Sequence, residues 1–226
     1  MNNKYSERFK DAPWFIGASS EKIIIGGAGG IGSNAMYFLA KTIPASYFIF
    51  DFDEVEEINV GTQFFPVDSI GKPKVRAVKD VLSSFGVENI NIFQSKIESN
   101  ILPIAISAFD NMSARKEMFE NWKNLENREI FIDGRLRASL YEIFIVQKGM
   151  EEDYEKTLFN DDEVEDDPCT FKQTAYFAGL IGARITQVLV NYLTNKYLGD
   201  ELCNIPFRIH EVGEPFLIKT EYVSSK

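Results

Sequence analysis

Short apolar runs alternate with segments of helical periodicity along the first part of this 226-residue chain. The run Lys22–Gly26 is apolar, ends in glycine and predicts a buried strand. Residues 31–41 follow, with Ala35 and Leu39 four positions apart, and this spacing predicts a helix that Pro44 terminates. The chain therefore begins its ordered part with a strand, a glycine-rich turn and a helix.

The same alternation continues to about residue 135. Strands are predicted at residues 47–50, 90–93, 104–109, 130–133 and 140–147, and helices at residues 72–85 and 112–125. Strands that alternate with helices indicate a mainly parallel sheet with helices on both faces. The predicted fold class is therefore α/β, a Rossmann-like doubly wound sheet.

After residue 150 the pattern changes. Residues 151–170 are strongly acidic and predict an exposed crossover loop, residues 174–198 predict a long helix, and residues 205–222 predict a β-hairpin. No linker separates two domains, so one domain over residues 1–226 is expected. Its parts are an N-terminal segment (1–20), a nucleotide-binding core (21–135), the acidic crossover loop (151–170) and the C-terminal helix and hairpin (171–226).

Composition narrows the class of protein. A hydrophobic fraction of 45% supports a substantial core, and a formal net charge of −10 argues against broad binding to nucleic acid or to an anionic membrane. The polar N-terminus does not resemble a secretory signal, and no apolar run is long enough for a membrane span. With only two cysteines, a reduced, cytoplasmic protein is the simplest interpretation.

The turn after the first predicted strand carries the first candidate site. Gly27, Gly29 and Gly32 form a G-x-G-x-x-G pattern between a strand and a helix, where backbone N–H groups can bind a phosphate. A purely structural turn is the alternative. Asp51 ends the second predicted strand, near the spacing expected for a ribose-binding acid, and Asp53 lies on the same side of an extended segment.

Further motifs follow in a fixed order and identify a family resemblance. They are Gly27–Gly32, the D-x-D-x-V segment 51–55, Asn59 with Gln63, Gly71 with Lys74, and Asp110-Asn111 followed by Arg115. Together they resemble the ThiF, MoeB and ubiquitin-activating enzyme superfamily, which the flanking segments fit more loosely. The ordered set is far more specific than the glycine loop alone.

The resemblance implies ATP and Mg²⁺ as cofactors and adenylation of a carboxylate at the C-terminus of a ubiquitin-like or sulfur-carrier protein. It also implies a homodimer. By resemblance, Lys74 contacts the phosphates and Asp110 holds Mg²⁺, although a helix N-cap is the alternative role for Asp110 and Asn111 could cap the helix instead. The implied nucleotide-binding residues are Gly27, Gly29, Gly30, Gly32, Asp51, Asp53, Asn59, Gln63 and Lys74.

One position departs from the family pattern. Thr62 stands where the family pattern has an arginine that helps neutralise the triphosphate. Another cation substitutes, or the enzyme belongs to a divergent branch with altered phosphate contacts, or the chain is an inactive partner subunit. Arg135 and Arg137 are candidate substitutes, and both could instead pair with surface acids. Arg8 is a third candidate, because a segment like Tyr5–Phe9 reaches the neighbouring subunit's ATP site in relatives, although a solvated arginine is the simpler interpretation. Since Lys74 and Asp110 are both kept, a divergent active enzyme is favoured.

Cys169 follows the acidic segment and precedes the long helix. In thioester-forming relatives a nucleophilic cysteine occupies such a crossover loop, which makes Cys169 a candidate catalytic residue. An incidental thiol is the alternative, and the neighbouring acids disfavour a thiolate. Three rival functions also stay open: adenylation of a small-molecule or peptide carboxylate, a non-catalytic partner subunit, and, as the weakest, a nicotinamide-dependent dehydrogenase.

Overall fold

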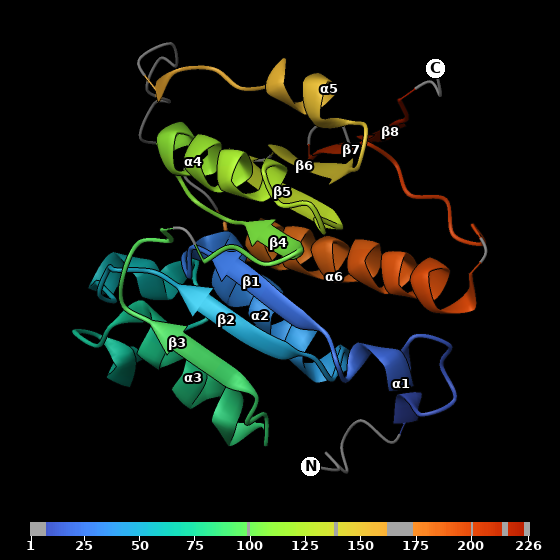
Figure 1. Ribbon diagram of the computed structural model, residues 1–226. Coiled ribbons are helices and arrows are strands. Elements are labelled where there is room, and N and C mark those ends of the chain that lie inside the picture. The colour runs from blue at the N-terminus through green and yellow to red at the C-terminus, as the bar shows by residue number, and fades with distance from the viewer. Residues whose placement is uncertain are drawn as a thin grey trace.

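A computed structural model describes residues 8–98, 100–137, 140–161, 174–199, 201–213 and 217–223. Its centre is an eight-stranded sheet with the strand order β3-β2-β1-β4-β5-β6-β7-β8 (Figure 1). The strands are β1 (Lys22–Gly26), β2 (Ser46–Phe50), β3 (Ile90–Phe93), β4 (Ile104–Ser107), β5 (Ile130–Arg137), β6 (Leu140–Gln147), β7 (Arg208–Val212) and β8 (Leu217–Glu221).

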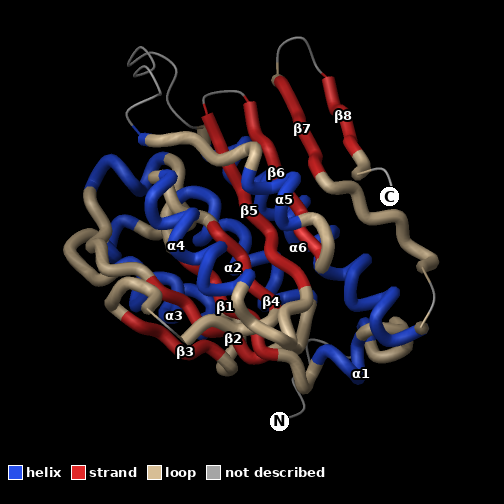
Figure 2. Tube along the Cα trace, turned by 45° about the horizontal axis from the view of Figure 1, so that its top comes forward, coloured by secondary structure: helices blue, strands red, loops and turns tan. Residues whose placement is uncertain are grey.

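The sheet has two halves. Neighbours from β3 to β5 pair in parallel, whereas β5, β6, β7 and β8 pair antiparallel in chain order. Figure 2 shows the antiparallel strands extending beyond the parallel ones at one end of the molecule. The helices are α1 (Phe15–Ala18), α2 (Gly30–Thr42), α3 (Lys74–Ser84), α4 (Met112–Lys123), α5 (Glu151–Glu155) and α6 (Ala175–Leu198), with 3-10 turns at Glu57–Gly61 and Val67–Ser69.

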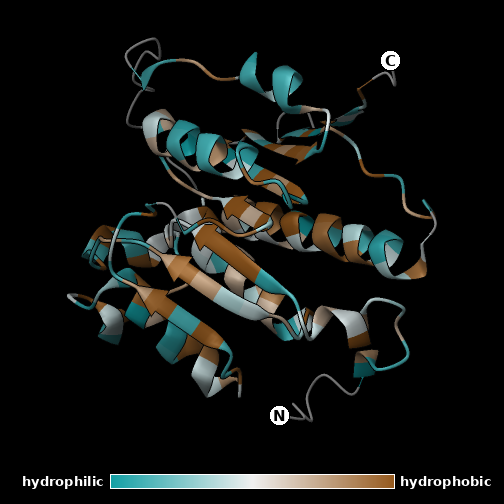
Figure 3. Ribbon diagram, viewed as in Figure 1, coloured by the Kyte–Doolittle hydropathy of each residue, from teal (hydrophilic) through white to brown (hydrophobic). Residues whose placement is uncertain are grey.

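Helices cover both faces of the sheet. The side chains of α2, α3 and α6 pack with Ile23 and Ile25 on one face, whereas α4 and α5 pack with Ile24 and Phe131 on the other. This division follows from the strand period of two, since consecutive isoleucines of β1 point to opposite faces. Figure 3 shows largely hydrophobic strands under a hydrophilic outer surface of α4. None of the described helices combines the length and hydrophobicity that crossing a membrane requires.

The predicted α/β fold class is confirmed, as are the long helix and the C-terminal hairpin. The prediction of a continuous acidic loop from residue 151 is wrong, because α5 begins there and buries Tyr154 in an aromatic cluster with Phe119 and Phe131. The Tyr154 hydroxyl also donates to Asp133, and Glu151 pairs with Arg128, so several contacts hold this helix against the sheet. Strand β5 also runs four residues beyond its predicted end at Asp133, to Arg137.

Close packing of α2 against α6 depends on one glycine. A Cβ atom at Gly182 would lie 2.7 Å from the backbone nitrogen of Ala35, which is closer than side chains tolerate. Three residues earlier in α6, a Cβ atom at Gly179 would lie 3.8 Å from its nearest neighbour, Asn34 Oδ1. The two positions therefore form a matched pair, in which only one glycine is required by packing.

We expect Gly182→Ala to lower the free energy of unfolding by roughly 1–3 kcal/mol, because the added methyl group forces α2 and α6 apart. Gly179→Ala, with the same change in helix propensity, should leave stability unchanged or raise it by up to about 1 kcal/mol. Urea titration followed by far-UV circular dichroism measures both. Equal stabilities of the two variants would show that the close α2–α6 approach is absent in solution.

Candidate active site

The carboxyl ends of β1, β2 and β4 are joined directly at one edge of the sheet. The N–H of Gly27 donates to the carbonyl oxygen of Phe50 at 2.8 Å, and the N–H of Ala108 donates to that of Gly26 at 2.8 Å. In open α/β sheets this edge is where ligands bind, because the helix N-termini and the loops after the strands meet there. The sequence motifs that follow these strands are thereby brought together.

The glycines of the loop have different roles. Gly27 has a φ of +92°, and a Cβ atom there would lie 2.6 Å from the carbonyl oxygen of Ala108. A Cβ atom at Gly32 would lie 1.9 Å from the carbonyl oxygen of Gly27, so these two glycines permit the tight turn onto α2. Gly29 instead faces open space, with its nearest neighbour, Gln63 Nε2, 4.0 Å away. The loop thus leaves room at Gly29 for a phosphate group.

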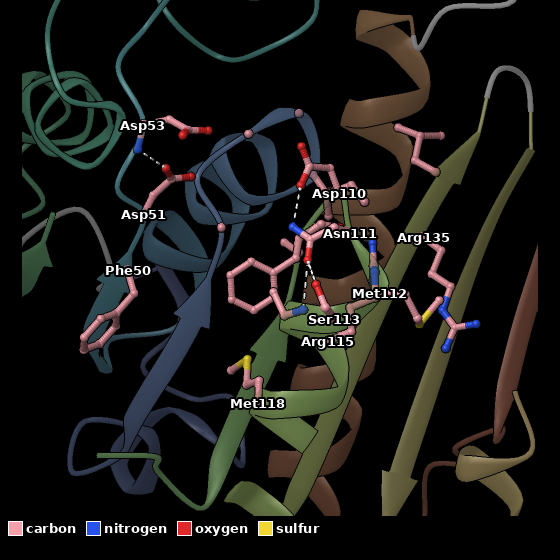
Figure 4. Close-up of a pocket in the computed structure, with 18 of the residues that line it drawn as sticks. Phe50, Asp51, Asp53, Asp110, Asn111, Met112, Ser113, Arg115, Met118 and Arg135 are labelled. Atoms are coloured by element: carbon pink, nitrogen blue, oxygen red, sulfur yellow. Dashed lines mark hydrogen bonds between the residues drawn. The ribbon is translucent and has the colours of Figure 1, made fainter. Parts of the chain in front are cut away.

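Asp51 is tied to the glycine loop. Its carboxylate accepts the N–H of Ala28 at 2.7 Å through one oxygen and the N–H of Asp53 at 2.8 Å through the other (Figure 4). Burial raises the pKa of the Asp51 carboxyl above its ordinary value, although both N–H donors oppose this. The predicted ribose acid therefore also fixes the shape of the loop to which the phosphates would bind.

Lys74 reaches the same edge through a short backbone ladder after β2. The N–H of Val55 donates to the carbonyl oxygen of Lys72, and the N–H of Lys74 donates to that of Asp53. Lys74 Nζ then lies 2.8 Å from Asp53 Oδ2, and its side chain is 11% exposed. The sequence spacing between the acid and the lysine thus becomes an ion pair beside the glycine loop.

Gln63 is placed over the loop, but Asn59 is not. The N–H of Phe64 donates to Ser33 Oγ in the first turn of α2, and this contact holds the segment against the loop. Gln63 lines the cavity, and its Oε1 is buried without a hydrogen-bond partner among the described residues. Asn59 is not among the lining residues; its side-chain oxygen accepts the N–H of Glu56 and closes a 3-10 turn.

The N-terminus of α4 carries the predicted metal ligand. Asn111, not Asp110, caps the helix, since its Oδ1 accepts the N–H of Ala114 at 2.8 Å. Asp110 is exposed and points toward the glycine-loop side of the cavity in Figure 4. The backbone N–H groups of Met112 and Ser113, in the first turn of α4, donate to the carboxylate of Asp161. These hydrogen bonds lower the pKa of the Asp161 carboxyl.

A buried ion-pair network lies behind α4. Asp133 is fully buried and accepts hydrogen bonds from Arg115, Arg135 and the Tyr154 hydroxyl. Burial opposes ionisation, but the charges of Arg115 and Arg135 outweigh it and hold the pKa of Asp133 below its ordinary value. Arg115 also donates to the carbonyl oxygen of Phe109, immediately before Asp110. Asp133 therefore connects the turn of the predicted metal ligand with α5.

Arg135 is engaged rather than free. Its Nε donates to Asp133 at 2.7 Å, and its terminal nitrogens donate to the carbonyl and hydroxyl oxygens of Thr157. Its guanidinium lies 4.3 Å from the centroid of the Phe144 ring. Arg135 borders the cavity on the side opposite Asp51 (Figure 4), so a phosphate would have to compete with these contacts.

One cavity of about 1110 Å³ collects most of the predicted residues. Gly27, Gly29, Gly30, Asp51, Asp53, Gln63, Lys74, Asp110, Arg135 and Arg137 line it. Gly32, Asn59 and Arg8 are not among the lining residues, and Arg8 is exposed. Cys169 lies outside the described residues. Sequence reasoning missed Lys96, Glu142 and Asp161, which also line the cavity. Only Lys96 could have been found, because it follows a parallel strand near its carboxyl end.

The donor set fits Mg²⁺ bound together with a nucleotide. The described residues contain no cluster of three or more histidine, cysteine or carboxylate side chains that could hold a metal ion by themselves. Mg²⁺ in phosphoryl and nucleotidyl transfer sites is commonly held by one or two carboxylates together with the substrate's phosphates. Asp110, exposed at the cavity, supplies such a carboxylate.

Comparison with known proteins assigns the family. The ThiF family model matches residues 17–213, so the chain belongs to the ThiF family. A curated relative, the ubiquitin-like modifier-activating enzyme 5 of Dictyostelium discoideum, is 28% identical in an alignment of 142 residues that covers 51% of this chain and 37% of the relative. The chain therefore spans little more than a third of that protein's length.

Solved structures share the fold. Selenomethionine-labelled PaaA is 18% identical with a TM-score of 0.72, over 93% of this chain and 66% of that one. E. coli MccB solved with AMPCPP and MccA is 17% identical with a TM-score of 0.73, over 100% of this chain and 72% of MccB. At this identity the likeness concerns the fold, and both structures are longer than this chain.

We expect Asp133→Asn to lower the free energy of unfolding at neutral pH by roughly 3–5 kcal/mol, because two buried guanidinium groups lose their charged partner. Tyr154→Phe removes one hydrogen bond from the same carboxylate and should cost only about 1 kcal/mol. Urea titration at pH 7 compares them. A loss in Asp133→Asn no larger than that in Tyr154→Phe would contradict the proposed dominance of the ion pairs.

The pH dependence of the same variant has a definite sign. Since the pKa of Asp133 is lowered in the folded state, its contribution is complete above the unfolded value of about 3.9 and is lost as pH falls through the folded value. The difference in unfolding free energy between wild type and Asp133→Asn should therefore be constant near neutrality and shrink below about pH 4. Thermal melts over a pH series measure this difference. A difference that grows on acidification would show that folding does not lower the pKa of Asp133.

Proposed function

We propose that this chain binds ATP with Mg²⁺ and adenylates a carboxylate, the second substrate being the C-terminus of a ubiquitin-like or sulfur-carrier protein. The observation that carries this proposal is the convergence of Gly29, Lys74 and Asp110 on one cavity. Membership of the ThiF family supports it. The solved complexes of E. coli MccB with ATP, and with AMPCPP and MccA, support a nucleotide together with a second substrate.

The division of the cavity fits two substrates. The glycine loop, Asp51 and Lys74 line one end, and the residues of β5 and β6, including Leu140 and Glu142, line the other. A nucleotide bound at the glycine loop would leave the second end for the acyl substrate. Asp110 lies between the two ends in Figure 4, where the α-phosphate and the attacking carboxylate would have to meet.

The residues divide the work of adenylation. Lys74 is paired with the half-exposed Asp53, so an arriving phosphate can compete for a lysine that is already held in position. Asp51 would bind the ribose and keep the loop's N–H groups oriented. Mg²⁺, held by Asp110 and the phosphates, would supply charge neutralisation as pyrophosphate leaves. Preorganised charge of this kind lowers the barrier most when it is fixed before the reaction.

The missing family arginine at Thr62 has candidate replacements at the cavity. Arg135, Arg137 and Lys96 line it, whereas Thr62 does not. Arg135 is held by Asp133 and Thr157, so a phosphate would have to compete with these contacts to reach it. Arg8 would act only across a homodimer, in the ATP site of the partner subunit. An inactive partner subunit is the less favoured alternative, because Lys74 and Asp110 keep positions suited to ATP and Mg²⁺.

ATP–pyrophosphate exchange in the presence of a candidate carrier tests the adenylation step. Lys74→Ala should reduce the exchange rate by roughly 10²–10³-fold, the usual cost of one preorganised electrostatic contact to the reacting group. Lys72→Ala removes an equal charge two residues away, outside the cavity, and should leave the rate unchanged. Equal losses in both variants would point to a general charge effect, and no exchange by wild type with any carrier or peptide would reject adenylation.

A second step to Cys169 is proposed as a thioester transfer, in which the thiolate attacks the acyl-adenylate and AMP leaves. Cys169→Ala should then retain pyrophosphate exchange and lose a carrier adduct that thiols cleave. Cys203→Ala is the matched control and should keep the adduct. Non-reducing electrophoresis with and without dithiothreitol reads the result, and an adduct that persists in Cys169→Ala would reject the thioester role.

A further inference from the structure

A second cavity of about 490 Å³ lies next to the proposed active site and plays no part in the function described above. Ligand pockets in proteins commonly have volumes of roughly 300–1000 Å³, so this one can hold a side chain and part of a backbone. Strands β6, β7 and β8 contribute to it from one side, and α5 and the residues after it from the other. Its lining residues are Phe144, Asp153, Thr157, Phe207, Arg208, Glu221, Tyr222 and Val223.

The strand register connects the two cavities. Asp133, Phe144, Arg208 and Glu221 are directly opposite one another on β5, β6, β7 and β8, so their side chains share one face of the sheet. Two guanidinium groups lie over the Phe144 ring: that of Arg135 at 4.3 Å from the centroid and that of Arg208 at 5.3 Å. Arg135 lines the first cavity and Arg208 the second, so Phe144 lies at the boundary between them.

Arg208 carries an unused hydrogen-bond donor. One terminal nitrogen donates to Glu142, and the other lies 3.3 Å from Glu221. Its Nε is buried and has no partner among the described residues. A buried donor without an acceptor costs about 1–3 kcal/mol. Since two carboxylates already balance the charge, the missing acceptor is best supplied by a neutral group such as a peptide carbonyl.

The remaining walls are mainly aromatic and aliphatic. Phe144 and Phe207 are buried, and Tyr222 is 52% exposed at the surface, with Val223 beside it. Such walls favour an apolar side chain, and the carboxylates Asp153 and Glu221 disfavour an acidic one. The chemistry of the second cavity therefore matches one residue of a polypeptide: an apolar side chain together with its backbone carbonyl.

We propose that the second cavity binds an aromatic or aliphatic residue about three positions upstream of the reacting carboxylate, in an extended C-terminal segment of the acyl substrate. Arg135, at the wall of the first cavity, and Arg208 belong to strands two spacings apart, or about 10 Å. Since an extended peptide rises about 3.3 Å per residue, three residues are the least that join a carboxylate in the first cavity to the second. This inference rests on the proposed function and deepens it, because it selects a polypeptide tail over a small molecule and assigns the position that determines specificity.

Binding of short synthetic peptides to the full chain tests the proposal. In acetyl-Ala-Phe-Ala-Gly-Gly the phenylalanine is the third residue before the C-terminal one, and the small neighbours leave it as the only group that fills the cavity. Isothermal titration calorimetry should show this peptide, or its leucine analogue, binding on the order of tenfold more tightly than the alanine analogue. The aspartate analogue should show no such gain, and neither should acetyl-Ala-Ala-Ala-Phe-Gly, which moves the aromatic group out of register.

Two variants locate the effect. Val223→Trp should fill the cavity and abolish the preference for phenylalanine, while the affinity for the alanine peptide stays unchanged. Leu217→Trp adds the same side chain at an exposed position of β8 outside the cavity and should keep the preference. Arg208→Lys retains the charge toward Glu142 and Glu221 but lacks Nε, and it should weaken the phenylalanine peptide several-fold, by the worth of about one hydrogen bond.

Equal affinity of the phenylalanine and alanine peptides, a preference that survives in Val223→Trp, or no binding of any peptide at millimolar concentration would overturn the proposal. Pyrophosphate exchange with the same peptides separates its failure from that of the proposed function. Preferential binding without exchange would keep the second cavity as a peptide subsite and reject adenylation. Pyrophosphate exchange at the same rate with the phenylalanine and alanine peptides would keep adenylation and reject the second cavity as a peptide subsite.

Discussion

The arrangement of the candidate site depends on one buried carboxylate, that of Asp133. It lies at the junction of the parallel and antiparallel halves of the sheet, where Arg115 of α4, Arg135 of β5 and Tyr154 of α5 meet. A carboxylate removed from water is stable only with such partners. The hydrogen bonds and ion pairs of Asp133 therefore hold α4, β5 and α5 together. Through Arg115 and the carbonyl of Phe109, the same network reaches the turn that presents the predicted metal ligand.

Local patterns in the sequence predicted the parallel half of the sheet well. The strand–turn–helix motif and the acid after β2 are short-range features, and their physical requirements can be read from adjacent residues. The spacing from Asp53 to Lys74 became an ion pair because a backbone ladder closes that segment. Asn59 illustrates the limit: the residue type fitted the motif, but its side chain is used within its own turn rather than at the cavity.

The antiparallel half contained what the sequence could not reveal. Helix α5 lies in a run of acids, and its single buried tyrosine packs against Phe119 and Phe131. That contact could not be predicted from the residues next to the tyrosine in the sequence. Glu142 and Arg208 are 66 residues apart, and nothing local indicates that they meet across two strands. Pairing between distant segments is set by tertiary packing, which periodicity does not report. Asp161 was likewise unrecognisable as the carboxylate that binds the N-terminus of α4.

The two kinds of strand pairing have an evolutionary consequence. The glycine-loop end of the sheet is built from parallel strands whose turns, glycines and ion pairs constrain one another, so few substitutions there leave the loop intact. The strands from β6 to β8 are joined by ladder pairing and by the ion pairs of Arg208 with Glu142 and Glu221, so their other side chains can vary without disturbing the glycine loop. On the proposed division of the cavity, a change of acyl partner requires changes on these strands, while the glycine loop is inherited intact.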